Sequence, residues 1–140
     1  MEILASYDDC VAVAKPSGML VHNSAWAGPP EPTLLDGVRA VVGGWLAPLH
    51  RLDRGTSGVV WFCRRADRYE ALHTAMRLDG TRKEYRALVR GHLRFTGVLD
   101  HAVPDGEGGR LDARSEIWPI ADSQVERVLS LIHISEPTRP

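Results

Sequence analysis

Residues 50–63 read His50-Arg51-Leu52-Asp53-Arg54-Gly55-Thr56-Ser57-Gly58-Val59-Val60-Trp61-Phe62-Cys63. The last five are apolar and rich in β-branched and aromatic side chains, which predicts a strand buried on both faces. Residues 50–58 before it are polar and form what we call the Asp53 loop. Because polar loops on a rigid scaffold commonly display reactive groups, we expect the functional site here.

The segments on either side of this stretch alternate between strand and helix patterns. We expect a strand at 11–14 and a short strand at 20–22. One helix is expected to open at Thr33 with Asp36 and to stop at Gly43-Gly44, and a second to open at Asp67 with Glu70. A further strand is expected at 83–91, with Tyr85, Ala87 and Val89 on one side. This mixture indicates an α+β or α/β domain.

The composition is that of an ordinary folded protein. The chain has 140 residues, of which 44% are hydrophobic and 25% charged, so one soluble domain is expected. No apolar stretch approaches the ~20 residues of a membrane span. The N-terminus lacks a secretory pattern, which makes the cytoplasm the expected location. Cys10 and Cys63 both lie in apolar runs, so we expect them reduced and buried.

Basic charge is concentrated in the middle of the chain. Residues 50–94 carry eleven Lys and Arg against five Asp and Glu, whereas the flanking segments are acidic. Such a segment is typical of a surface that meets phosphates, but a solvated face with charges of both signs explains it equally well.

Asp53 is the candidate reactive group of the loop. Arg51 and Arg54 flank it in the sequence, which favours its ionised form and suits a nucleophile or an electrostatic stabiliser. The alternative is a turn in which Asp53, Thr56 and Ser57 bond to the backbone.

The motif His50-Arg51-Leu52-Asp53-x-x-Thr56-Ser57-Gly58 resembles the signature of the RluA family of pseudouridine synthases. Two more segments resemble family motifs in the expected order: Ala14-Lys15-Pro16-Ser17-Gly18 with Val21-His22, and Lys83-Glu84-Tyr85-Arg86-Ala87-Leu88-Val89-Arg90-Gly91. Three ordered motifs are far more specific than one. The likeness covers about residues 3–128. Because the chain begins directly at the first strand, it also resembles the short members of the family that lack an S4 RNA-binding domain.

The resemblance implies an α+β catalytic fold with a mixed, mostly antiparallel sheet and flanking helices. It also implies conversion of uridine to pseudouridine in structured RNA, without a cofactor or metal. Asp53 would act at C1′ of the ribose, as glycosidase carboxylates do at an anomeric carbon. Tyr85 would pack on the flipped base and take or relay the C5 proton. Ordinary strand packing is the other interpretation of Tyr85.

The remaining site residues follow from the same resemblance. Arg51 would fill the gap left by the flipped base, or contact a phosphate. Arg54 and Lys83 are expected to contact RNA. His50 is also assigned to the RNA-binding site, and we expect it to fix the loop by hydrogen bonding rather than to transfer protons. RNA is the expected partner, tRNA before rRNA, with neither DNA nor a membrane, and the oligomeric state is left open.

The end of the chain departs from the family pattern. A third motif, Gly-Arg-x-His-Gln, is missing, and the segment Leu129–Pro140 resembles the translation of a transposon-based sequencing adapter. We therefore expect residues 1–128 to be the N-terminal part of the catalytic domain, 129–140 to be a non-native tail, and this chain to be inactive or nearly so. A natural divergent strand is the alternative.

Two other functions are compatible with the sequence. One is a noncatalytic RNA-binding module on the same scaffold. The other is a glycoside-processing enzyme that pairs Asp53 with Glu84 or Asp79, which the basic surroundings disfavour.

Overall fold

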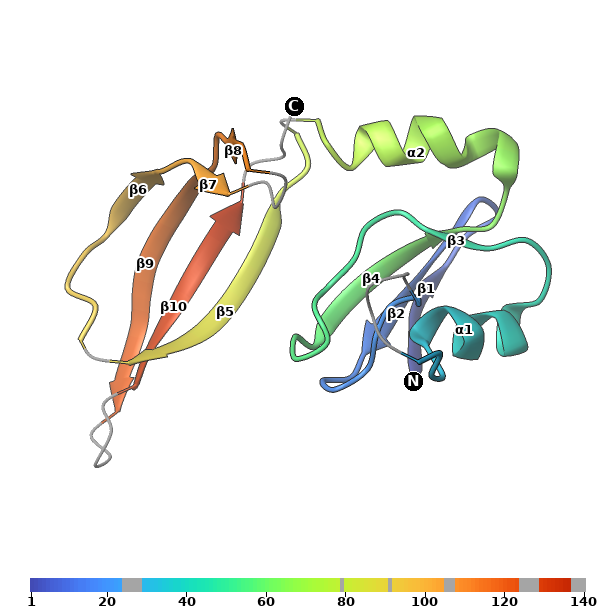
Figure 1. Ribbon diagram of the computed structural model, residues 1–140, viewed down its shortest axis with the longest axis horizontal. Helices are drawn as coiled ribbons and strands as arrows, with labels where there is room; N and C mark the ends of the chain where they lie inside the picture. Colours follow the sequence, from blue (N-terminus) through green and yellow to red (C-terminus); the bar gives the residue numbers. More distant parts are fainter. Residues whose placement is uncertain (24–28, 79, 91, 105–107, 124–128, 137–140) are drawn as a thin grey trace. The chain divides into compact units, whose positions relative to one another are not determined.

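The computed structural model describes residues 1–23, 29–78, 80–90, 92–104, 108–123 and 129–136 (Figure 1). The chain divides into two compact units, Met1–Met76 and Arg77–Pro140, and each is described by itself. The α+β prediction is confirmed, and all described strand pairs are antiparallel.

The first unit is built on a four-stranded sheet. Its strands are β1 (Glu2–Ser6), β2 (Cys10–Lys15), β3 (Ala47–Pro48) and β4 (Gly58–Cys63), in the order β1-β2-β4-β3. The strand expected at 11–14 is confirmed as β2. The short strand expected at 20–22 is wrong: the carbonyls of Leu20 and Val21 instead accept hydrogen bonds from the amides of Leu34 and Leu35, at 2.9 Å each.

The core of this unit lies between the sheet and α1 (Leu34–Val42). Its fully buried residues are Val11, Val13, Val60, Phe62, Leu34 and Val38. The prediction that 59–63 is buried on both faces is wrong, because Val59 is 48% exposed. Strand side chains alternate between faces, and on the face away from Phe62 the ring of Trp61 stacks on Tyr7.

Helix α1 begins where the sequence predicts. The Thr33 hydroxyl oxygen accepts from the amide of Asp36 at 3.3 Å, and the Asp36 carboxylate accepts from the amide of Thr33 at 3.0 Å. This reciprocal pair satisfies two helix-end donors. The helix ends at Gly43, whose φ of 73° suits glycine.

We expect Thr33→Ala to lower the free energy of unfolding by about 1 kcal/mol, because it removes the side-chain acceptor for the first turn. Urea denaturation followed by circular dichroism measures this change. Thr33→Ser retains the acceptor and is the matched control, so an equal loss in both variants would contradict the capping explanation.

The same cap predicts a pH dependence. Hydrogen bonds from Thr33 lower the pKa of the Asp36 carboxyl, so its ionised form stabilises the fold. This contribution is complete above the pKa of the unfolded chain, about 4, and is lost as the pH falls through the lower folded pKa. The stability difference between the wild type and Asp36→Asn should therefore shrink in acid, as measured by denaturation midpoints from pH 7 downward.

The second helix is confirmed, but its expected cap is wrong. A 3-10 turn, η1 (Ala66–Arg68), precedes α2 (Tyr69–Ala75), and no side chain caps either one. Asp67 is engaged elsewhere, because its carboxylate accepts two hydrogen bonds from Arg65. An arginine two residues away competes for the oxygens that would have capped the helix.

The second unit is a strand-rich segment. β5 (Lys83–Arg90), β6 (Gly97–Asp100), β9 (Arg114–Ser123) and β10 (Leu129–Glu136) form a sheet in the order β5-β10-β9-β6. A small second sheet joins β7 (Val103–Pro104) to β8 (Arg110–Leu111). Residues 129–136 belong to the segment expected to be a foreign tail, yet they pair with β5 over their whole length and with β9 from Leu129 to Ser135.

Candidate functional site

The Asp53 loop is held by the segment that follows β2, about 40 residues earlier in the chain. The Ser17 hydroxyl donates to the carbonyl of Gly55 at 2.7 Å, and the Gly18 amide donates to that of Arg54 at 2.7 Å. Gly18 has a φ of 87°, which permits this tight reversal. Two of the three motifs found in the sequence are therefore parts of one local structure.

Lys15 is the central element of this structure. Its side chain is fully buried, and its Nζ donates to the carbonyls of Pro16 and Arg54 at 3.1 Å and of Thr56 at 2.6 Å. A buried ammonium needs such partners to offset its lost hydration. The pKa of Lys15 is lowered, because the effect of burial exceeds the opposing effect of the nearby Asp53 carboxylate. The ammonium therefore shapes the loop and interacts electrostatically with Asp53.

Asp53 itself is exposed to solvent, as are its neighbours Arg51 and Arg54. The amide of Thr56 donates to the carbonyl of Asp53 at 3.0 Å, so the main chain makes a turn at this point. Leu52, the residue directly before Asp53, packs against the apolar core. The loop thus presents a carboxylate to solvent from a backbone fixed on both sides.

Two further residues of the loop have partners within the first unit. The Nε2 atom of His50 accepts a hydrogen bond from the Trp61 amide at 3.2 Å, which ties the start of the loop to β4 as expected. The Arg54 guanidinium forms an ion pair with Glu31 at 2.5 Å. That pair lies at the surface, so it offsets part of the charge of Arg54 but leaves the side chain half exposed.

Tyr85 and Lys83 belong to the second unit, on β5. Tyr85, Ala87 and Val89 are half-buried, whereas Glu84, Arg86 and Leu88 are exposed, so the predicted alternation of this strand is confirmed. Asp53 belongs to the first unit, and its approach to Tyr85 stays a prediction. Asp79, which the glycoside hypothesis would use, lies outside the described residues.

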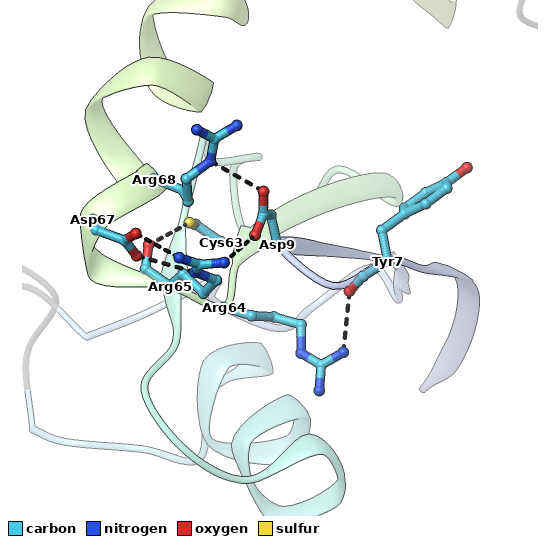
Figure 2. A network of polar contacts seen from close by, with 7 residues as sticks. All are labelled: Tyr7, Asp9, Cys63, Arg64, Arg65, Asp67 and Arg68. Carbon is cyan, nitrogen blue, oxygen red and sulfur yellow. Dashed lines mark hydrogen bonds and ion pairs between the residues drawn. The ribbon is translucent and has the colours of Figure 1, made fainter.

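The basic segment carries acids beside several of its arginines (Figure 2). Arg65 pairs with Asp67 at 2.6 Å and with Asp9 at 3.4 Å, and Arg68 pairs with Asp9 at 3.1 Å. Arg65 also lowers the pKa of the Asp67 carboxyl. At the end of β4, therefore, the surface carries charges of both signs rather than a purely basic patch.

The role of Lys15 is the functional feature that our sequence analysis missed. Its motif was found, but nothing in a single sequence shows which carbonyls a lysine will meet. A signal was present, since a lysine ends an otherwise apolar strand directly before Pro16. Lysines are almost never fully buried unless they are paired.

The described ranges lack two kinds of feature. No helix there is long and apolar enough to cross a membrane. In the same residues, no three His, Cys, Asp or Glu side chains gather as a metal would require.

Comparisons with known proteins give a consistent result. The model of the RNA pseudouridylate synthase family matches residues 9–130. Proteins named tRNA pseudouridine synthase C are similar over 104 residues, 74% of this chain: 34% identical in Haemophilus ducreyi and 38% in Vibrio parahaemolyticus. The chain spans 42% of the length of each.

Solved structures share the fold. The human RNA pseudouridylate synthase domain containing 4 has a TM-score of 0.74 at 19% identity, over 99% of this chain and 60% of that one. The human domain containing 1 has a TM-score of 0.75 at 17% identity, with the same coverage.

Proposed function

Since this chain belongs to the RNA pseudouridylate synthase family and is an RluA-type member, we propose that it is part of an enzyme that isomerises uridine to pseudouridine in tRNA. The name of its bacterial relatives supports tRNA as the RNA class. A tRNA substrate would place the enzyme in the cytoplasm.

The observation that carries this proposal is the fixed loop around Asp53. Pseudouridine formation breaks the bond between N1 and C1′ and makes a bond between C1′ and C5, with loss of the C5 hydrogen. A carboxylate at C1′ can stabilise the cation-like sugar, add to it, or take a proton from it. Lys15 and Ser17 bind the backbone of residues 54–56, so Asp53 is oriented before substrate arrives.

The other site residues complete the proposed mechanism. Tyr85 packs on the flipped uracil and takes or relays the C5 proton. Arg51 is exposed beside Asp53 and stacks in the gap left in the RNA. Arg54 and Lys83 contact RNA, Arg54 after partial release from Glu31. His50 keeps the loop attached to β4.

We further propose that residues 1–128 are the N-terminal part of a longer catalytic domain and that 129–140 are foreign. The family match ends at residue 130, which supports this division. Exposed apolar side chains in the second unit, Leu88, Val98, Leu99 and Ile120, suit a sheet that a further segment covers. The pairing of β10 is compatible with a foreign origin, because main-chain hydrogen bonds require only an extended strand.

The test uses the parent gene, recovered from uncut source DNA beyond codon 128. Its product is incubated with tRNA and rRNA that carry tritium at C5 of uridine. We expect tritium release from tRNA, and release below about 1% of that rate from the 140-residue chain, which spans 42% of the length of its relatives. A parent protein that binds tRNA tightly but releases no tritium would refute the enzyme and favour the noncatalytic module.

A further inference from the structure

The two cysteines of the chain face each other across the centre of the first sheet. β2 and β4 lie side by side (Figure 1), and their register pairs Cys10 with Cys63. The Arg64 amide donates to the Asp9 carbonyl at 2.8 Å, and the Cys10 carbonyl accepts from Tyr7 on the side of β1. Cys10 and Cys63 therefore form a non-hydrogen-bonded pair, the kind in which opposite side chains are closest.

The spacing of such a pair suits a disulfide. Opposite Cα atoms in a non-hydrogen-bonded pair lie about 4.5 Å apart, and disulfides span Cα distances of about 4.4–6.8 Å. Because the paired residues are directly opposite, both thiols are on the same face of the sheet. A bond would need only a small approach of the two β-carbons.

The two thiols differ in solvent exposure, and this determines which of them reacts first with a small reagent. Cys63 is fully buried and its Sγ donates to the carbonyl of Arg65 at 3.0 Å (Figure 2). Cys10 is half-buried, so a small reagent meets it first. Burial raises the pKa of Cys10, and Cys63 and Asp9 raise it further. A raised pKa leaves less of the Cys10 sulfur as the reactive thiolate, which slows its reaction with an oxidant.

We propose that Cys10 and Cys63 form a dithiol modification site that a small-molecule disulfide such as oxidised glutathione closes into a cross-strand disulfide. The sulfur of Cys10, after losing its proton, attacks one glutathione sulfur and releases one glutathione thiolate. The sulfur of Cys63 then attacks the sulfur of Cys10 and releases the second. One disulfide is reduced as one forms, and the two cysteine protons end on two glutathione thiols.

The disulfide would be a reversible cross-link between two strands of the sheet. It joins the two central strands at the end opposite to Lys15 and Gly58, which are paired beside the Asp53 loop. It would close a long chain segment and so restrict the unfolded state. This inference stands on the register of β2 and β4 and not on the proposed function.

The test treats the native 140-residue chain with oxidised glutathione, then counts free thiols after denaturation. The chain has 2 cysteines, so the result is unambiguous. We expect no free thiol, a mass lower by about 2 Da, migration as a monomer without reductant, and recovery of both thiols with dithiothreitol. The melting temperature of the oxidised chain should rise by about 5 °C or more.

Cys10→Ser and Cys63→Ser serve as matched controls, each with one thiol. They should stop at a glutathione adduct, heavier by about 305 Da, or remain unmodified. The proposal is overturned if the wild-type chain keeps two free thiols, accumulates the adduct, or forms only intermolecular dimers. Each of these readings is made on the wild-type chain and does not depend on whether the variants fold.

Discussion

Replacing Asp53 by Asn is expected to reduce tritium release by the parent protein by about 10³-fold or more, because the amide can neither add to C1′ nor carry the charge that stabilises the sugar cation. Asp53 is exposed and Asn is nearly isosteric, so the fold should not change. The measurement is single-turnover tritium release from C5-labelled tRNA, with enzyme in excess over RNA. Circular dichroism and tRNA affinity are recorded beside it.

Asp8→Asn is the matched control, since Asp8 is also an exposed aspartate in the first unit but lies in the turn between β1 and β2. It should leave the rate of tritium release unchanged. For Asp53→Asn, loss of tritium release with retained tRNA binding supports a catalytic role of Asp53. Loss of both would make Asp53 a binding residue, and retention of both would remove it from the site.

Local rules explain which parts of the fold could be predicted. The cap of Thr33 with Asp36, the stop at Gly43 and the strand β5 depend on residues within a few positions of each other, and all three are confirmed. The cap expected at Asp67 failed for an equally local reason, since Arg65 takes its carboxylate. A pattern predicts a side chain's options but does not rank its competing partners.

Burial was harder to predict, because it depends on which elements cover each face of a sheet. The apolar run 59–63 reads as a strand covered on both sides, yet only the face of Val60 and Phe62 meets α1. The other face uses Trp61 and Tyr7 to cover itself. Aromatic side chains at an exposed strand make a half-covered sheet look like a buried one in the sequence.

The candidate site, too, could be predicted from the sequence only in part. The order of the three motifs identified the family from the sequence, and the roles that the resemblance implies for Asp53, Tyr85 and Arg51 stay predictions. The contact between the first and second motifs, through Lys15, required the structure. The pairing of Arg54 with Glu31 joins residues 23 positions apart and had no signal in the sequence. The approach of Tyr85 to Asp53 stays a prediction.

Lys15→Met is expected to lower the free energy of unfolding of the first unit by about 3 kcal/mol. Three hydrogen bonds from a charged donor are lost, each worth about 1.5–3 kcal/mol, and the carbonyls of Arg54 and Thr56 are left without that partner. The saved cost of burying an ammonium offsets part of this loss. Because the backbone beside Asp53 is released, tritium release by the parent protein should also fall, by about 10-fold or more under conditions where the variant is folded.

The chain offers its own control, since Lys15 and Lys83 are its two lysines. Lys83→Met removes the same functional group from a half-buried position on β5 and should change the stability of the first unit little. Acetylation of the native protein gives a second reading: Lys83 should react while Lys15, at 2% exposure, is protected. Rapid acetylation of Lys15, or equal stability losses in the two variants, would mean that the ammonium does not support the loop. The orientation of Asp53 would then need another cause.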